Sequence, residues 1–246
     1  MLPAARVRTA HADAWAVEGA ARERDGGGAL TLQSIRVMAS GLRQPQFNSA
    51  IVAGPGVDLE AVRAFYAERD LPWGILVPAG MAWGAGRYLR SLSLMGASRG
   101  GLQRPPEVPD LALRTAGPDD LETVVRIDTT AFGSDPDELR PWTEPHLRGG
   151  PFTTAVAELA GEPVATAFTV RSEGAAGPAV YLAGVAVLEA ARRRGIAAAM
   201  SAWLLERGFA AGARLAHLHA DTDTAARVYS RLGFAPAGEL DIYVDL

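Results

Sequence analysis

Apolar and polar residues in the second half of the chain follow two different periods in turn. Alternating or continuous apolar runs predict strands, whereas apolar residues spaced three and four positions apart predict amphipathic helices. After residue 110 the pattern predicts a strand at 111–115, a helix at 121–132, a shorter helix at 135–147 that two prolines oppose, strands at 152–159, 164–170 and 180–187, a helix at 194–210, a strand at 214–219, a helix at 223–232 and a strand pair in 236–246. This order predicts a mixed α/β unit.

The first half of the chain alternates strand and helix patterns in a similar way. We expect strands at 34–39 and 47–53, a helix at 58–69, a strand at 73–77, a helix at 81–89 and a strand at 91–95. Residues 1–30 include three consecutive glycines near their end and are expected to be a mobile segment. Residues 99–109 are rich in Gly and Pro and predict a linker. The predicted units are therefore 1–30, a first α/β domain at 31–98, the linker, and a second domain at 110–246.

Composition narrows the class of protein. The chain has 246 residues, of which 48% are hydrophobic and 21% charged, as is typical of a folded globular protein. It contains no cysteine, which excludes disulfides, thiolate metal sites and cysteine nucleophiles. The net charge is −4, and no apolar run reaches the length of about 20 residues that spans a membrane. We therefore expect a cytoplasmic protein with no nucleic-acid or membrane partner.

The strongest chemical feature lies where the predicted strand at 180–187 leads into the next helix. The chain passes through Arg192, Arg193, Arg194 and Gly195 into the first helical turn. The first N–H groups of a helix have no partner within it and lie at the positive end of its dipole, so they can bind a phosphate. Gly195 lets a ligand approach the backbone, and the arginines add positive charge. A solvated basic turn before an ordinary surface helix is the structural alternative.

Two motifs in this half resemble those of the GNAT superfamily of N-acetyltransferases. Residues 192–197 fit the acyl-CoA signature R-x-x-G-x-A, and residues 221–234, DTDTAARVYSRLGF, are similar to the late helix of the family. The element order over 110–246 is also similar to the GNAT acyl-CoA N-acyltransferase fold, a mixed sheet with flanking helices. The first domain resembles a partial, degenerate unit of the same kind.

The resemblance implies a site for acetyl-CoA as co-substrate. The pyrophosphate would bind the N–H groups of 193–198, and the pantetheine arm would lie in a split between the strands at 180–187 and 214–219. Tyr229 would be the general acid toward the leaving thiolate. The implied cofactor-binding residues are Val185, Ala186, Val187, Arg192, Arg193, Arg194, Gly195, Ile196, Ala197, Ala198, Thr222 and Ala225.

The sequence assigns neither a general base nor a metal site. The strand at 180–187 holds no carboxylate, and the nearest candidate bases by topology are Glu158, Glu173 and Asp128. Each of them is expected to be a solvated surface charge, and a water relayed by backbone carbonyls is the alternative, so no base is assigned. His217 and His219 share one face of a strand, but a metal site needs further ligands, so we expect no metal. The two imidazoles are expected to face the acceptor cleft instead.

The matching turn of the first domain, at 52–57, differs from the basic turn of the second. It has glycines but no arginine, and Pro55 removes one N–H donor. We expect that it does not hold pyrophosphate. The first domain would then either cover the core of the second or form one wall of the acceptor site, and Trp73, Trp83 and Tyr88 are expected to pack in its core.

These observations favour an N-acetyltransferase that transfers the acetyl group of acetyl-CoA to a primary amine by direct attack, without an acyl-enzyme. A catalytically silent acyl-CoA-binding or regulatory protein is the alternative, favoured by the missing strand carboxylate. A nucleic-acid binder would draw on the arginine triplet alone and is opposed by the acidic net charge. The acceptor would be a small-molecule or peptide amine, and a homodimer is left open.

Overall fold

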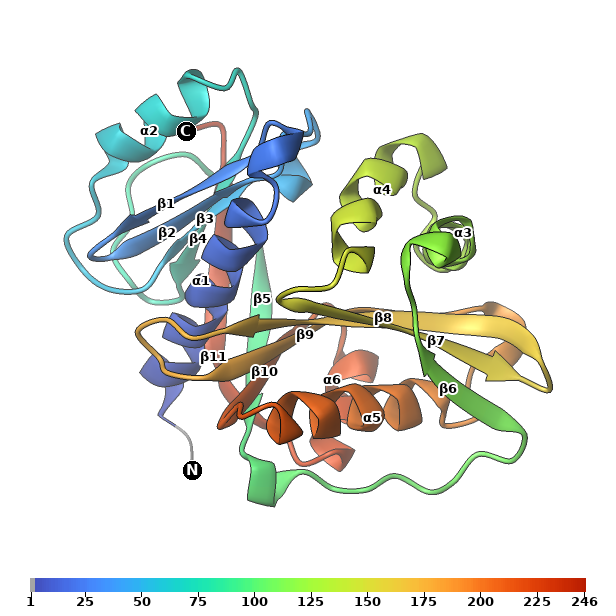
Figure 1. The fold of residues 1–246 in the computed structure, drawn as a ribbon. Coiled ribbons are helices and arrows are strands. Elements are labelled where there is room, and N and C mark those ends of the chain that lie inside the picture. Colours follow the sequence, from blue (N-terminus) through green and yellow to red (C-terminus); the bar gives the residue numbers. More distant parts are fainter. Residues whose placement is uncertain (1–2) are drawn as a thin grey trace.

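The computed structural model describes residues 3–246, with helices on both faces of a long twisted sheet (Figure 1). The helices are α1 (Ala4–Ala20), α2 (Leu59–Ala67), α3 (Leu121–Phe132), α4 (Pro136–Thr143), α5 (Ile196–Ala210) and α6 (Asp223–Arg231). The strands are β1 (Gly28–Leu32), β2 (Ile35–Ala39), β3 (Ser49–Val52), β4 (Gly74–Pro78), β5 (Arg87–Ala97), β6 (Leu111–Thr115), β7 (Phe152–Leu159), β8 (Glu162–Ser172), β9 (Ala179–Val187), β10 (Leu215–Ala220) and β11 (Ala235–Val244).

The strands of both halves form one continuous sheet. The order of its 11 strands is β1-β2-β3-β4-β11-β5-β10-β9-β8-β7-β6. The last strand of the chain, β11, pairs with β4 and β5 of the first half, and β5 also pairs with β10. Strands of the two halves are thus interleaved at the centre of the sheet. The boundary between two domains at the 99–109 linker stays a prediction.

Helices on opposite faces define the two sides of the second half. In Figure 1, α3 and α4 lie above its strands, whereas α5 and α6 lie below them. Met200 and Leu204 of α5 pack with apolar residues of β7 to β10 in a buried core, as the apolar face of an amphipathic helix requires. A separate core holds α2 against β2, β3 and β4, with Val62 and Tyr66 fully buried.

The N-terminal segment is not mobile as expected but forms α1, which packs against strands of both halves. His11, Asp13 and Glu18 of this helix are buried. Because small and polar residues are buried around much of α1, the sequence shows no apolar stripe of helical period. Gly19 permits the close contact with β1, since a Cβ at this position would overlap the carbonyl of Gly28. Residues 1 and 2 of the predicted segment lie outside the described residues.

Two other elements differ from the prediction. Residues 81–89 form turns and the beginning of β5 rather than a helix, and Gly86 there adopts a φ of 75° that a helix does not allow. Residues 236–246 contain one strand rather than a pair. A bulge interrupts the pairing of β11 with β5 between Pro236 and Glu239, and Gly238 lies within it, so the chain continues as one bulged strand.

The elements predicted for 111–232 are confirmed, with shifts of a few residues at their ends. The helix that prolines opposed is present: Pro141 lies inside α4, and a 3₁₀ turn at Glu144–Leu147 follows. Gly233 ends α6 in the left-handed conformation, with a φ of 92°. Within residues 3–246, none of the helices combines the length and the apolar character needed to cross a membrane.

Candidate active site

The start of α5 lies in a cleft of about 840 Å³. Val187 and residues 192–198 line this cleft together with the linker residues 104–108 and one face of α6. Gly195 precedes α5 in the left-handed conformation, with a φ of 84°, and no side chain of residues 3–246 caps this end. The first N–H groups of α5 are therefore left for an external acceptor, at the positive end of the helix dipole. The geometry is that of an anion site.

The corresponding helix of the first half, α2, begins differently. The carboxylate of Asp58 caps it and accepts a hydrogen bond from the N–H of Ala61 at 3.0 Å. A carboxylate in this position satisfies a free donor and repels a second anion. This cap supports the prediction that the turn at 52–57 does not hold pyrophosphate.

β9 and β10 separate beside the cleft. These parallel strands pair only from Leu215 with Ala179 to His217 with Tyr181. Beyond Tyr181, β9 continues through residues 182–187 without β10 as a partner, and its open edge leads to the start of α5. The predicted split between the two strands is thus present in the fold, and it leaves backbone groups of β9 free to bind an extended ligand.

A bulge in β9 lies halfway along this open edge. The pairing of β8 with β9 shifts register between Thr166 and Phe168, and Gly184 at the bulge has a φ of 59°. A Cβ at Gly184 would lie 2.8 Å from the Phe168 ring, so only glycine fits here. The bulge interrupts the regular ladder of β8 and β9 beside a cavity that α3 also lines.

The three arginines of the basic turn have different surroundings. Arg192 donates from Nε to the carbonyl of Val187 at 3.0 Å and from Nη2 to the carbonyl of Ala131 at 3.3 Å. It therefore braces the end of β9 against α3, which is a structural contact that the sequence did not indicate. Arg193 and Arg194 are exposed at the rim of the cleft, where their charges can reach an anion.

Tyr229 lies on α6 near the end of the β9–β10 pairing. It packs against the core beneath α5, with its ring 6.1 Å from that of Phe234. Burial, reinforced by the charge of Asp221, raises the pKa of Tyr229 to about 12. The phenol therefore stays protonated throughout the neutral pH range. Burial is the main cause that raises the pKa of Tyr181 well above its usual value, and the proximity of Tyr229 is a smaller cause.

Not all predicted cofactor-binding residues line the cleft. The hydroxyl of Thr222 caps α6 and accepts from the N–H of Ala225 at 3.2 Å, so both residues contribute to the start of that helix. The cleft is lined by Val187, Arg192, Arg193, Arg194, Gly195, Ile196, Ala197 and Ala198, whereas Val185, Ala186, Thr222, Ala225 and Tyr229 lie outside its lining.

Comparison with known protein families agrees with this geometry. Residues 121–234 match the Acetyltransferase (GNAT) family. This stretch holds the bulged β9, the uncapped start of α5 and the whole of α6. Residues 121–234 are a GNAT domain.

Solved structures extend the likeness in fold to the first half of the chain. A GCN5-related N-acetyltransferase from Kribbella flavida is similar with a TM-score of 0.72 and 22% identity, over 98% of this chain and 95% of that chain. A GCN5-related N-acetyltransferase from Sphaerobacter thermophilus gives a TM-score of 0.55 and 20% identity, over 98% of this chain and 91% of that chain. No curated protein matches this chain. The shared fold thus includes the first half, which the match to the GNAT family does not reach.

The cleft of the GNAT domain also contains residues that the motifs did not indicate. Arg227 and Arg231, one turn apart on α6, line it opposite the start of α5, and Arg104 of the linker lines it as well. Val108 packs on the start of α5, 3.3 Å from where a Cβ of Gly195 would lie. The spacing of four residues between Arg227 and Arg231 could have indicated a basic face of α6 in the sequence. The position of the linker beside the cleft could not have been predicted from the sequence.

His217 is buried beneath α1, His219 is 20% exposed beside it, and neither lines the cleft at the start of α5. The ring of His217 lies 5.6 Å from that of His11 and stacks on Tyr181 at 5.3 Å, and Nδ1 of His219 lies 3.1 Å from the Tyr181 hydroxyl. Burial lowers the pKa of His11 and lowers that of His217 to about 3. Within residues 3–246, no three His, Asp or Glu side chains come together as metal ligands.

Glu158 and Glu173, two of the three carboxylates considered as bases, form ion pairs away from β9. Glu158 accepts from Arg114 at 2.7 Å, and Glu173 accepts from Arg171 at 3.3 Å. Glu173 is largely exposed, as expected of a solvated charge. Neither carboxylate lines the cleft or the cavity beside Gly184.

Asp128 differs from both, and its expected exposure to solvent is wrong. Its Oδ1 is buried and has no hydrogen-bond partner among the described residues. It lines a cavity of about 10 Å³ that Gly184 of the β9 bulge also lines. Burial raises the pKa of Asp128 to about 8. The helical period of α3 placed Asp128 one turn after Val124, which was the signal available in the sequence.

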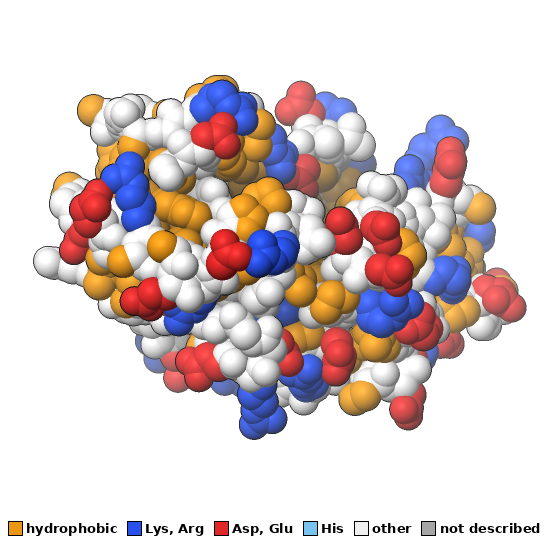
Figure 2. Space-filling model, turned by 90° about the horizontal axis from the view of Figure 1, so that it is seen from above, with side chains coloured by type: hydrophobic (Ala, Val, Ile, Leu, Met, Phe, Trp, Pro, Cys, Tyr) orange, Lys and Arg blue, Asp and Glu red, His pale blue; other side chains and the backbone are white. Residues whose placement is uncertain are grey.

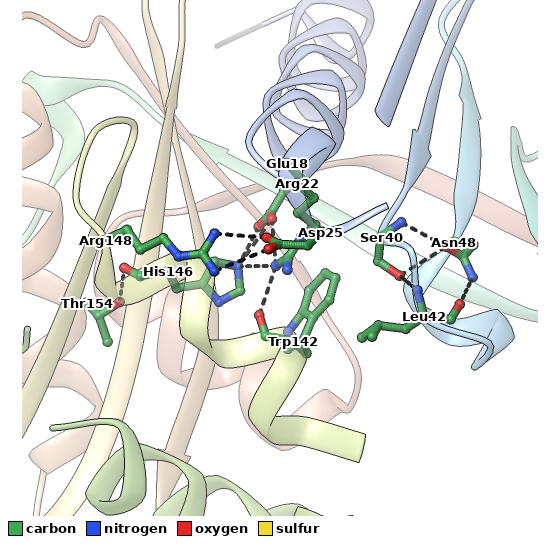
Figure 3. A network of polar contacts seen from close by, with 10 residues as sticks. All are labelled: Glu18, Arg22, Asp25, Ser40, Leu42, Asn48, Trp142, His146, Arg148 and Thr154. Atoms are coloured by element: carbon green, nitrogen blue, oxygen red, sulfur yellow. Dashed lines mark hydrogen bonds and ion pairs between the residues drawn. The ribbon is translucent and has the colours of Figure 1, made fainter. Parts of the chain in front are cut away.

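A buried polar network holds the wall of this cavity to α1 (Figure 3). Nε2 of His146 lies 3.1 Å from both carboxylate oxygens of Glu18, and Nη2 of Arg22 lies 3.2 Å from Glu18. The same Nη2 donates to the carbonyl of Trp142 at 2.9 Å, and the guanidinium lies 4.0 Å over the Trp142 ring. Because Trp142 and His146 line the cavity with Asp128, α1 fixes that wall.

Proposed function

We propose that the protein is an acetyl-CoA-dependent N-acetyltransferase that transfers the acetyl group to a primary amine by direct attack. The uncapped start of α5, opening into a cleft beside the free edge of β9, is the observation that carries this proposal. Membership of residues 121–234 in the GNAT family supports acyl transfer as the class of reaction.

The cleft fits the charged end of acetyl-CoA. The N–H groups at the start of α5, from 193 to 198, would bind the diphosphate, and Arg193 and Arg194 would add charge-assisted contacts. Arg227 and Arg231 on the opposite wall would raise the local positive charge. The volume of about 840 Å³ is in the range of sites that hold a ligand of this kind.

The free edge of β9 would hold the pantetheine arm. Val185, Ala186 and Val187 follow the bulge and lead to the start of α5, so an extended amide chain bound there would run from the diphosphate to Gly184. This would place the thioester near the bulge, where an amine can meet its carbonyl at near-attack distance.

Tyr229 would assist the leaving thiolate. Because the pKa of Tyr229 is about 12, its phenol holds its proton at every pH at which the enzyme would work. It can donate a hydrogen bond to the sulfur as negative charge develops, and acid assistance of this kind contributes about 10² to 10⁴ in rate.

The amine would approach from the face that carries α1, α3 and α4. Figure 2, which views the molecule from the side of α3 and α4, shows acidic, basic and apolar side chains interspersed, without one sign of charge prevailing. Acceptor selection would therefore depend on individual contacts of a small-molecule or peptide amine and not on long-range attraction.

Thiol release across a panel of amines tests the proposal. The panel holds a polyamine, an aminoglycoside, free amino acids and a short peptide with a free N-terminus, each incubated with acetyl-CoA and the full chain. We expect release of free CoA thiol with at least one amine, together with a product heavier by one acetyl group. Tight acetyl-CoA binding without turnover on any amine would contradict catalysis and indicate a silent acyl-CoA-binding protein.

A further inference from the structure

One carboxylate oxygen of Asp128 is buried without a hydrogen-bond partner among the described residues, and a function of this side chain would explain it. Most buried carboxylate oxygens accept hydrogen bonds, because an unpaired buried polar atom costs about 1–3 kcal/mol or more. Oδ1 of Asp128 is buried on the sheet-facing side of α3 and accepts none from the described residues. Such a group is costly to the fold, and it lies beside the proposed reaction centre.

The cavity beside Asp128 reaches the bulge of β9. Its volume of about 10 Å³ has room for about one water molecule or one small polar group. The hydroxyls of Thr154 and Thr166, which also line the cavity, donate to backbone carbonyls. Thr154 donates to the carbonyl of His146 at 3.0 Å, and Thr166 donates to the carbonyl of Ala155 at 3.0 Å. Asp128 therefore offers a free acceptor toward Gly184.

We propose that Asp128 is the general base of the reaction and takes a proton from the ammonium group of the acceptor amine. This inference rests on the proposed acetyl transfer. The ammonium gives one proton to the Asp128 carboxylate, and the freed nitrogen lone pair attacks the thioester carbon. The C–N bond forms and the C–S bond breaks, and the electron pair leaves on the sulfur. The nitrogen loses its second proton to water, Tyr229 gives a proton to the thiolate and regains one from water, and Asp128 releases its proton to water, so that one proton is set free per acetyl group transferred.

The environment of Asp128 suits this role. A base works best when its pKa lies near the working pH, and burial raises the pKa of Asp128 to about 8. His146 is the titratable side chain that shares its cavity, with Glu18 and Arg22 behind it. β9 contributes no charged residue. The charged groups on the elements packed around α3 are Asp137, Glu138 and Arg140 on α4, Glu144 in the turn that carries His146, Glu162 and Arg171 at the ends of β8, and Asp119 and Asp120 before α3. α3 itself carries Glu122 and Arg126, and Arg192 reaches its end.

Asp128→Asn tests the proposal, with Glu122→Gln on the same helix as the matched control. The asparagine keeps the shape and removes the charge, so the chain is expected to fold, which thermal unfolding checks. Glu122 is an exposed partner of Arg140 and lies outside the cavity. Both variants and the wild type are assayed over pH 6–11 with acetyl-CoA and the amine that releases thiol fastest, and acetyl-CoA affinity is measured by calorimetry.

We expect Asp128→Asn to lower kcat/KM about 10² to 10⁴-fold at neutral pH. The rise of kcat/KM with pH should move from near 8 to the pKa of the acceptor itself, about 10 for a lysine-like amine. The difference from wild type should narrow where the amine is already neutral, and acetyl-CoA affinity and the Glu122→Gln profile should not change.

A pH profile of Asp128→Asn that matches wild type would overturn the role of Asp128 while leaving acetyl transfer intact. A uniform loss at every pH, with no shift of the rise, would also overturn it and assign Asp128 to packing. Absence of thiol release from the wild type would overturn the proposed function first, and the assignment of the base with it.

Discussion

Tyr229 retains its proton because burial and the charge of Asp221 raise its pKa. We expect Tyr229→Phe to lower kcat about 10²-fold or more, since the phenylalanine cannot donate to the leaving sulfur. Acetyl-CoA affinity should be nearly unchanged, because Tyr229 does not line the cleft that would hold the diphosphate. Single-turnover rates and calorimetric titration measure the two quantities separately. Unaltered turnover would remove Tyr229 from the mechanism.

The sequence predicted residues within a motif better than residues whose role depends on burial. Arg193, Gly195 and Ala197 line the cleft as their spacing indicated, because consecutive residues of a strand–turn–helix connection remain neighbours in any fold. The state of Asp128 depends on α4, β8 and β9 closing around it, and those contacts are far apart in sequence. Arg192 stays a predicted phosphate ligand by its place in the motif, and it also donates to two backbone carbonyls, which the motif did not indicate.

At the scale of elements, α1 depends on the buried network of Glu18, Arg22 and His146. Burial alone would raise the pKa of Glu18, but the contacts with His146 and Arg22 outweigh it and lower that pKa. Glu18→Gln would leave the Arg22 guanidinium buried without its countercharge. We expect a loss of about 3–5 kcal/mol in the free energy of unfolding, measured by urea denaturation.

Glu23→Gln is the matched control for that substitution. Glu23 follows α1 at an exposed position and is expected to change stability by less than about 0.5 kcal/mol. Equal stability of Glu18→Gln and wild type would show that the network does not hold α1 in place.

The elements that could be predicted are those that expose one face. α3 buries one face at helical spacing, and β7 to β9 hold continuous buried apolar runs, so their patterns were visible in the sequence. α1 is packed on several sides and includes buried polar residues, so neither its helical period nor its cover over β10 was visible. The pairing of β5 with β11 at the centre of the sheet could not be predicted from the sequence around either strand, because either strand could pair elsewhere.

At the scale of the whole molecule, of the four histidines of the chain, His11, His146 and His217 are buried and His219 is 20% exposed, and desolvation is the first cause that lowers the pKa of each. The unfolded chain binds protons below about pH 6.5, whereas the folded chain does so only at lower pH. The contribution of the neutral histidines to the free energy of unfolding is therefore fully present above about pH 6.5. It is lost as the pH falls, by up to about 1.4 kcal/mol per pH unit for each histidine. Urea denaturation at several pH values between 7.5 and 5 measures this slope.

His217→Phe provides the internal comparison for the acid slope. It removes one of these imidazoles, both of whose nitrogens are buried without partners among the described residues, and keeps an aromatic ring against Tyr181. In this variant the free energy of unfolding should fall less steeply as the pH decreases, because unfolding takes up about one proton fewer. A free energy of unfolding that stays constant from pH 7.5 to 5 in the wild type would contradict a neutral state of the four imidazoles in the folded chain.

Calorimetric titration of the full chain with acetyl-CoA tests the central claim most directly. We predict binding at one site per chain, weakened at least about tenfold in the double variant Arg193→Glu and Arg194→Glu, because charge-assisted contacts to phosphate are each worth about 1.5–3 kcal/mol. The double variant Arg24→Glu and Arg63→Glu changes the net charge equally at exposed positions outside the cleft, and it should bind as the wild type does. No binding by the wild type, or equal affinity in all three proteins, would contradict a diphosphate site at the start of α5.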